Sequence, residues 1–188
     1  MIRETIVTSL SRGDGVHIAP MGVHVLAGEM LILPFKPSTT LDNILATGHA
    51  VLNHCDDVRI FAGCLTGRRD WPLVATELVP GRRLAAALAH VELELIRHED
   101  DALRPRLHCR VVQEAMHGPF AGFNRAQFSV LEAAILVSRL DRLPWDKIES
   151  ELAYLRIGLE KTAGEREWEA WGWLMETIET FRLARGRQ

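Results

Sequence analysis

Alternation of apolar and polar residues, the period of a β-strand, dominates the chain up to about residue 117. Residues 2–8 alternate and precede the turn-forming run 12–15. Further strands are expected at 16–25, 30–36, 49–53, 88–98 and 106–116. The acidic run 99–101 between the last two indicates a hairpin with one solvated face. Many strands with short connections predict an antiparallel barrel or sandwich.

Helical spacing interrupts this pattern in a short helix and a further helical turn, and replaces it beyond residue 117. Residues 38–48 predict a short helix, because Ser38, Thr39 and Thr40 are N-cap candidates and Gly48 can end it. Residues 56–65 predict a further helical turn.

The C-terminal third of the chain has helical spacing throughout. Helices are expected at 124–140, from Trp145 to about residue 163, and after Gly164, since Pro144 and Gly164 break the pattern. The expected apolar faces are Phe128, Leu131, Ile135 and Ser138 in the first helix, and Trp168, Trp171, Met175 and Ile178 in the third. We therefore expect a β domain at 1–120 and a helical extension at 121–188, which packs on the barrel or on a dimer partner.

Composition narrows the class of protein. The 188 residues are 47% hydrophobic and 25% charged, as in ordinary globular domains. A net charge of −3 provides no basic surface for nucleic acid. No apolar run approaches the roughly 20 residues that span a bilayer, and the first residues do not resemble a signal peptide. We expect a cytoplasmic protein that binds neither nucleic acid nor membrane.

The cysteines suggest no structural cross-link. Their number is odd, no CxxC pair occurs, and buried reduced thiols are the simplest interpretation of Cys55, Cys64 and Cys109. A mixed metal site from His54, Cys55, His108 and Cys109 stays open as an alternative, although their spacing matches no standard ligand pattern.

The segment GVHIAPMGVHV, residues 15–25, has β-branched alternation at both ends but Pro-Met-Gly in its middle. Proline and glycine both weaken a strand interior, so an interruption is expected there. A metal site is one hypothesis, but His17 and His24 are seven residues apart and fall on opposite faces of a regular strand. The other hypothesis is that backbone at Ala19, Pro20, Met21 and Gly22 approaches a bound molecule.

The segment KPSTTLDN, residues 36–43, supports the second hypothesis. It places Lys36 and three hydroxyls at the start of a predicted helix, where unpaired amides attract phosphate. An ordinary N-cap with a solvated lysine would give the same local pattern. An opened strand followed by a phosphate-type cap suits a ligand with a flat ring and a phosphate tail.

These residues resemble the flavin-reductase-like family of FMN-binding split barrels. Ser38-Thr39-Thr40 matches the family's phosphate-binding Ser-x-Thr segment, and Asn53 matches an asparagine that ends a strand. The segment from Ala19 to Gly22 matches the flavin-edge strand, although Pro20 departs from the small polar residues usual in flavin reductases.

A narrower resemblance covers nearly the whole chain. The segments ETIVT, APMGV, NHCDD, HVELELI and FNRAQFSVLEAAILVSRL are together similar to an uncharacterised split-barrel family of archaea and methylotrophic bacteria. That family adds C-terminal helices to the barrel, and its genomic context implies a link to methanopterin-dependent one-carbon metabolism.

The resemblance implies an antiparallel Greek-key split β-barrel followed by a helical bundle. It further implies a homodimer with FMN near the interface, and oxidoreductase chemistry carried by the flavin. The candidate FMN contacts are Ala19, Pro20, Met21, Gly22, Lys36, Ser38, Thr39, Thr40, Asn43, Asn53 and Arg125. Two alternatives stay open: a protein that binds FMN or another phosphorylated ligand without turnover, and a metal protein.

Overall fold

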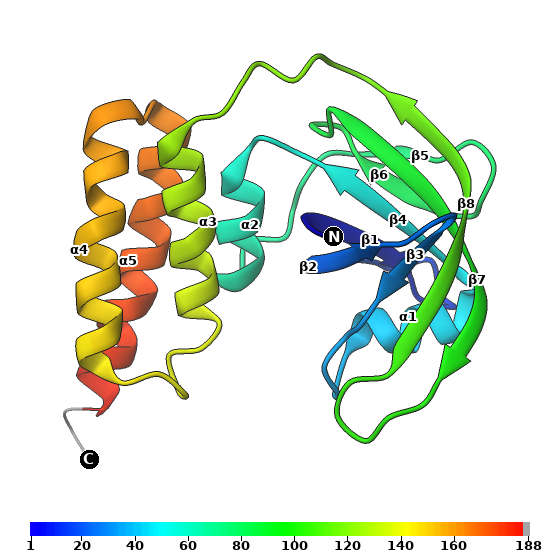
Figure 1. The fold of residues 1–188 in the computed structure, drawn as a ribbon, viewed down its shortest axis with the longest axis horizontal. Coiled ribbons are helices and arrows are strands. Elements are labelled where there is room, and N and C mark those ends of the chain that lie inside the picture. The colour runs from blue at the N-terminus through cyan, green and yellow to red at the C-terminus, as the bar shows by residue number, and fades with distance from the viewer. Residues whose placement is uncertain (186–188) are drawn as a thin grey trace. The chain divides into compact units, whose positions relative to one another are not determined.

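The computed structural model describes residues 1–185 and contains, within them, eight strands and five helices (Figure 1). The strands are β1 (Ile2–Leu10), β2 (Val16–Val25), β3 (Glu29–Ile32), β4 (His49–His54), β5 (Leu73–Ala75), β6 (Arg82–Leu84), β7 (Ala89–Glu99) and β8 (Arg106–Met116). The helices are α1 (Thr39–Thr47), α2 (Val58–Leu65), α3 (Arg125–Val137), α4 (Trp145–Thr162) and α5 (Glu165–Arg185).

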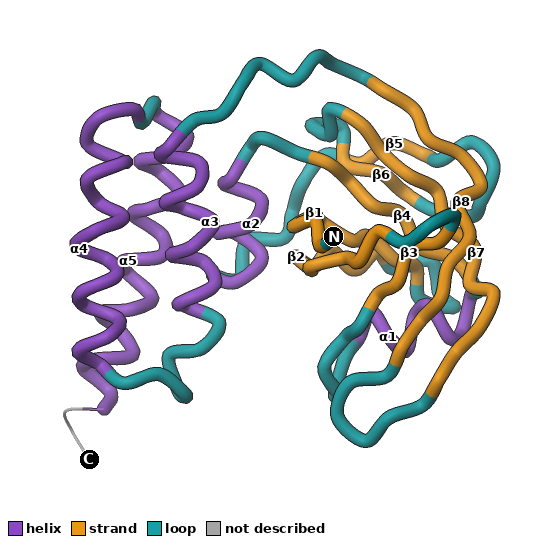
Figure 2. Tube along the Cα trace, in the orientation of Figure 1, coloured by secondary structure: helices purple, strands orange, loops and turns teal. Residues whose placement is uncertain are grey.

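The chain divides into two compact units. Residues 1–55 and 70–120 form the first, and residues 56–69 join those from 121 onward in the second. Figure 2 shows the first as strands with α1, and the second as helices. The second unit therefore takes in α2, a segment that lies well before the domain boundary expected near residue 120.

The first unit is a closed antiparallel barrel with strand order β1-β2-β3-β8-β7-β4. Strand β1 pairs with both β2 and β4, which closes the barrel and places β4, β1, β2 and β3 in the order of a Greek key. The expected barrel is confirmed. The short pair β5-β6, which the alternation pattern does not predict, forms a separate two-stranded sheet.

The barrel interior is filled from all six strands and from α1. The core consists of Val7, Val23, Ile32, Leu41, Ile44, Ala50, Leu52, Val91, Leu93, Leu107 and Cys109. Within each strand these residues alternate with residues of the outer face, as the period-two pattern requires. Burial of Cys109 in this core raises the pKa of its thiol to about 12, and burial likewise raises the pKa of Cys64 in the other unit to about 11.

Strand β2 is continuous, so the interruption expected at Pro20-Met21-Gly22 is wrong. Its register with β1 runs without a bulge from Ile2↔His24 to Leu10↔Val16. Pro20 is accommodated because β3 pairs only with Val23–Val25, which leaves one edge of the preceding residues outside the ladder.

The second unit packs α2, α3, α4 and α5 together. Its core contains Val58, Ala62, Ala126, Val130, Ala133, Ala134, Leu136, Leu155, Leu159, Ala170, Trp171 and Leu174. The apolar face expected for α3 is wrong, because Phe128 is 52% exposed, whereas the buried residues are Ala126, Ser129, Val130, Ala133, Ala134 and Leu136. A Cβ atom on Gly158 would lie 2.7 Å from Ser129 Oγ, so small residues allow α3 and α4 to approach closely. In α5, Trp171 and Ile178 are buried as expected, but Trp168 is 42% exposed.

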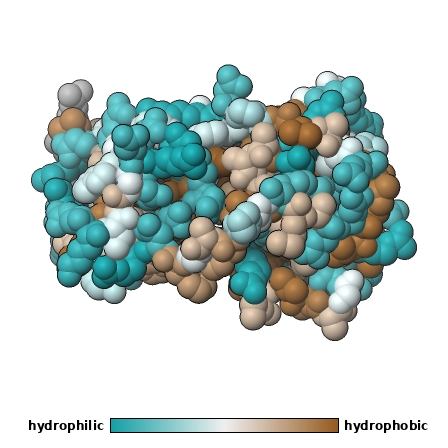
Figure 3. Space-filling model, turned by 90° about the horizontal axis from the view of Figure 1, so that it is seen from above, coloured by the Kyte–Doolittle hydropathy of each residue, from teal (hydrophilic) through white to brown (hydrophobic). Residues whose placement is uncertain are grey.

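The face of the molecule drawn in Figure 3 mixes hydrophilic and hydrophobic residues, as is usual for a globular protein. Among the helices of residues 1–185, none is long and apolar enough to cross a membrane.

Candidate functional site

The N-terminus of α1 is built as the sequence predicts. Ser38 has extended backbone angles, and its side chain accepts a hydrogen bond of 3.2 Å from the backbone N–H of Leu41. Gly48 ends the helix in the left-handed conformation, with φ of 77°. The hydroxyl of Ser38 is therefore used as an N-cap.

The next two residues have polar groups that the protein does not use. Within residues 1–185, the backbone N–H groups of Thr39 and Thr40 find no hydrogen-bond acceptor. Thr40 is only 1% exposed, and its Oγ1 atom is one of two buried side-chain polar atoms without a partner in the described chain. An unpaired buried hydroxyl costs free energy, so it points to a partner outside the chain.

Lys36 lies just before this helix but points its charge at another group. Its Nζ atom donates to Asp100 Oδ1 at 2.5 Å, and the lysine side chain is 35% exposed. This hydrogen bond and the charge of Lys36 hold the pKa of Asp100 below its ordinary value. Any role of Lys36 toward a phosphate would thus compete with Asp100.

The predicted ring-edge segment lies on the part of β2 that pairs with β1 alone. Ala19, Met21 and Val23 point to the barrel interior, where Met21 packs against the core, and Pro20 and Gly22 point to the other face. A Cβ atom on Gly22 would lie 3.0 Å from Ile2 Cγ2 and 3.2 Å from Glu4 Oε1. Glycine at this position therefore also makes room for side chains of β1.

The two predicted asparagines are both buried and both engaged. Asn53 donates from Nδ2 to backbone and side-chain oxygens of β1 and β4, and its Oδ1 accepts 2.7 Å from the backbone N–H of Leu84. Asn43 donates from Nδ2 to Ser9 Oγ at 3.1 Å. These bonds connect neighbouring elements of the barrel unit.

The remaining candidates are not brought together. Arg125 is an exposed residue at the start of α3, in the helical unit. His108 and Cys109 point to opposite faces of β8, and Cys109 packs in the barrel core. No group of three or more His, Cys, Asp or Glu residues suited to a metal ion occurs among the described residues. None of the three cysteines forms a disulfide there.

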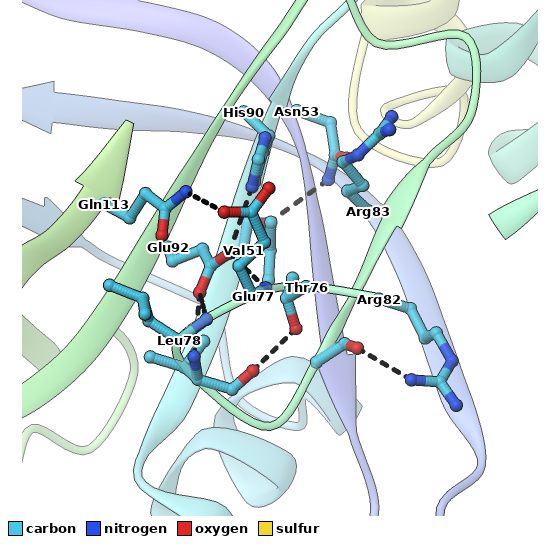
Figure 4. Close-up of polar contacts among 12 residues, drawn as sticks. Val51, Asn53, Thr76, Glu77, Leu78, Arg82, Arg83, His90, Glu92 and Gln113 are labelled. Atoms are coloured by element: carbon cyan, nitrogen blue, oxygen red, sulfur yellow. Dashed lines mark hydrogen bonds and ion pairs between the residues drawn. The ribbon is translucent and has the colours of Figure 1, made fainter. Parts of the chain in front are cut away.

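A buried carboxylate that the sequence does not single out is the centre of a polar cluster in the barrel unit (Figure 4). Glu92 is fully buried, and its two oxygens accept hydrogen bonds of 2.8 Å from the consecutive backbone N–H groups of Glu77, Leu78 and Val79. His90 Nε2 lies 3.2 Å from Glu92 Oε1. Burial alone would raise the pKa of Glu92, but the three amides and His90 outweigh it and lower that pKa.

Two histidines extend this centre toward the surface. His90 is 1% exposed, and its Nδ1 atom lies 2.8 Å from Nε2 of His117, an exposed residue. The two rings stack with centroids 5.0 Å apart. Partial desolvation and the nearby charges of Arg83 and His90 lower the pKa of His117, and Glu77 opposes them.

Part of this arrangement could be inferred from sequence. His90 and Glu92 are two residues apart in a predicted strand, which places both on one face. The position of His117 could not be inferred from sequence, because its contact with His90 depends on the pairing of β7 with β8 and on the turn of the chain after β8.

The fold defines a six-stranded antiparallel split barrel with appended helices. The chain belongs to the family described as protein of unknown function DUF447: residues 3–118 match its N-terminal domain and residues 124–176 match its C-terminal part. The resemblance to an uncharacterised split-barrel family is thereby confirmed.

Solved structures share this fold. The crystal structure of an FMN-bound DUF447 protein from Methanosarcina mazei superposes with a TM-score of 0.79 over 94% of both chains, at 20% identity. The 2-nitrobenzoate 2-nitroreductase NbaA of Pseudomonas fluorescens has a TM-score of 0.54 and 20% identity, over 61% of this chain and 64% of that one. A component B of nitrilotriacetate monooxygenase from Mycobacterium thermoresistibile has a TM-score of 0.53 and 16% identity, over 61% and 68%. No curated protein matches the sequence.

Proposed function

We propose that this protein binds FMN and is an oxidoreductase of the flavin-reductase-like class. The observation that carries the proposal is the N-terminus of α1, where two amides and the buried Thr40 hydroxyl have no partner within residues 1–185. Support also comes from the fold, which is similar along almost its whole length to a protein whose crystal structure contains FMN.

The terminal phosphate of FMN fits the start of α1. The amides of Thr39 and Thr40 and both threonine hydroxyls would bind it, and the positive end of the helix dipole would stabilise its charge. Ser38 would orient these groups as the N-cap. Lys36 would contribute charge only in exchange for its ion pair with Asp100.

The flavin ring fits the edge of β2 between Ala19 and Gly22, which pairs with no second strand among residues 1–185. Proline cannot donate a ladder hydrogen bond, so the nitrogen of Pro20 is placed best on the open edge. Alternation along an antiparallel strand then puts the backbone N–H and C=O of Gly22 on the same edge. These groups would bind polar atoms of the ring, and Met21 would hold the strand against the barrel core.

When bound, FMN would supply hydride and electron transfer, and the protein would bind and orient it. We propose a homodimer with FMN near its interface and Arg125 close to the phosphate. We also propose, from the family resemblance, a place in methanopterin-dependent one-carbon metabolism. The barrel residues Asn43 and Asn53 would support the site by fixing the strands around it.

The absorption spectrum of the purified protein tests the cofactor. We expect an oxidised-flavin spectrum as isolated or after reconstitution, with FMN as the released compound by mass; FAD, or no flavin, would contradict the proposal.

Light scattering would test the dimer. Addition of NADH or NADPH tests the reaction, because an enzyme should bleach the flavin absorbance and turn over with an acceptor. Bound FMN without turnover would favour a non-catalytic carrier.

A further inference from the structure

A fully buried carboxylate is connected to an exposed imidazole through one buried histidine. Glu92, His90 and His117 form this chain, with contacts of 3.2 Å and 2.8 Å. We propose that the three residues form a proton-transfer site, in which His117 exchanges a proton with a small weak acid that carries negative charge. The proposal stands on the geometry of the barrel and does not require FMN.

The direction of each hydrogen bond follows from the buried carboxylate. Three backbone amides already donate to Glu92, so this group is an ionised acceptor and His90 must carry its proton on Nε2. In neutral His90 the Nδ1 atom is then an acceptor, which requires His117 to donate from Nε2. Neutral His117 is left with an unprotonated Nδ1, and no group within residues 1–185 makes a hydrogen bond to that atom.

A proton that arrives at His117 Nδ1 can be compensated inside the barrel. The acid's bond to the proton breaks and its electron pair stays on the acid, while the lone pair of His117 Nδ1 forms a new N–H bond. The proton on His117 Nε2 can then move across 2.8 Å to His90 Nδ1. The positive charge would thus lie on His90 beside the Glu92 carboxylate, which is the arrangement by which a buried carboxylate stabilises an imidazolium in catalytic triads.

The charged groups around His117 favour an anionic partner. Desolvation is the main cause that lowers the pKa of His117; the positive charge of Arg83, on β6, lowers it further, and Glu77, on the β5-β6 connection, opposes both. Glu77 accepts 2.8 Å from Gln113 Nε2, whereas Arg83 forms no ion pair with a carboxylate in the described chain. A negatively charged weak acid that approaches His117 would therefore be attracted by the positive charge of Arg83.

The tautomers and protonation of the histidines test the proposal in the full-length chain. Long-range nitrogen–proton NMR spectra of ¹⁵N-labelled protein, recorded across a pH titration, distinguish Nδ1 from Nε2. We expect neutral His117 to carry its proton on Nε2, and one proton to be taken up jointly by His90 and His117. A neutral His117 protonated on Nδ1, or two independent titrations, would overturn the proposal.

The variant His90→Gln separates charge transfer from simple repulsion. A glutamine can still donate to Glu92 and accept from His117, but it cannot take up a proton. If charge moves inward in the native protein, the pH at which His117 is half protonated should be lower in H90Q than in the native protein, by about one pH unit. If His90 only repels charge on His117, its removal should shift this titration up, and that result, or no shift, would sink the proposal.

Inorganic phosphate, an anionic weak acid, serves as the probe of the partner class. At constant ionic strength we expect it to perturb the ring signals of His117, and we expect Arg83→Gln to abolish that effect while His117 keeps its tautomer. If phosphate does not perturb the His117 signals of the native protein, or perturbs them equally in R83Q, the proposal that the partner is an anion would be overturned. Because these spectra are taken without FMN, failure of the proposed cofactor would not alter them.

Discussion

The side-chain oxygen of Asn53 accepts a 2.7 Å hydrogen bond from the backbone N–H of Leu84, which joins β4 to the short strand β6. The two N–H groups of the same side chain are shared among three oxygens, Ile6 O, Thr8 Oγ1 and Val51 O, which lie 3.1–3.3 Å from Nδ2. One fully buried amide therefore fixes three elements of the barrel unit. Its donor and acceptor ends are not interchangeable, because each faces groups of the opposite kind.

The change Asn53→Asp should destabilise the barrel strongly. It replaces the amide donor by an oxygen that faces two backbone carbonyl oxygens, of Ile6 and Val51, and we expect a loss of about 3 kcal/mol or more in the free energy of unfolding. The matched control is Asn43→Asp, which should cost much less, since the Ser9 hydroxyl can rotate to donate to the new carboxylate. Urea unfolding followed by circular dichroism gives both values; equal losses would contradict this account.

The elements that follow local signals could be predicted from the sequence. Strand β8 has the expected bounds, and α1 is capped by Ser38 and ended by Gly48 as expected. Strands β5 and β6 could not be predicted from the sequence, since three residues are too few to show alternation. The buried face of α3 differs from the expected one because three alanines contribute to it with Val130 and Leu136, whereas the large Phe128 remains exposed.

The candidate site shows the same division. The cap at α1 is a local feature and appears in the sequence as a run of hydroxyls. The burial of Glu92 depends on a connection, residues 76–81, that folds over one face of β7, and alternation alone assigns that face to solvent. Local periodicity cannot indicate which polar face another segment will cover.

The change Asp100→Asn should strengthen FMN binding at low salt. It removes the partner of Lys36, which lies before α1, and so leaves the lysine charge available to a phosphate. We expect an affinity gain of about threefold that disappears at high salt, because exposed charges are screened. Fluorescence titration at two salt concentrations measures it. In the double variant Lys36→Met/Asp100→Asn the gain should vanish; a gain that persists there would exclude Lys36 as its cause.

The cysteines should differ in reactivity. Burial raises the pKa of Cys64 to about 11 and of Cys109 to about 12, so neither forms much thiolate at pH 8. Cys55 is only partly buried. We expect iodoacetamide to modify Cys55 first in the folded protein, and all three residues in urea, as peptide mass spectrometry would detect. Rapid modification of Cys109 in the folded state would contradict the barrel core described here.

Acid should destabilise the barrel through Glu92. Its pKa is lowered on folding, so its contribution is present above the pKa of the unfolded chain, about 4.3, and is lost as pH falls through the lower folded value. The variant Glu92→Gln should lose about 2 kcal/mol of unfolding free energy at pH 7, because its amide NH₂ group cannot accept, so in either orientation at least one of the three backbone N–H groups loses its acceptor. It should also lose less stability between pH 5 and pH 3 than the native protein, in urea unfolding at each pH. A parallel decline of both proteins would exclude Glu92 as the source.

The isosteric change Thr40→Val tests the phosphate site without disturbing the barrel. The Oγ1 atom of Thr40 has no partner within residues 1–185, so its removal should leave the free energy of unfolding unchanged or slightly higher. If that hydroxyl binds the phosphate, its charge-assisted hydrogen bond is worth roughly 1.5–3 kcal/mol, and FMN affinity should fall by about tenfold or more. Riboflavin, which has the ring but no phosphate, should bind T40V as it binds the native protein.

Two further variants make this pattern specific. Thr39→Val, at an exposed hydroxyl of the same helix turn, should weaken FMN binding by less than T40V, because the Thr39 hydroxyl can bond to water when no phosphate is bound.

Gly22→Ala should weaken the binding of FMN and riboflavin alike if the ring lies against β2. Pairing it with Glu4→Ala removes one of the β1 side chains that the new methyl group would meet. Fluorescence titration of both ligands against each variant gives the affinities. Equal losses of FMN and riboflavin in T40V would show that Thr40 shapes the helix rather than binding phosphate, and the proposed phosphate position would be wrong.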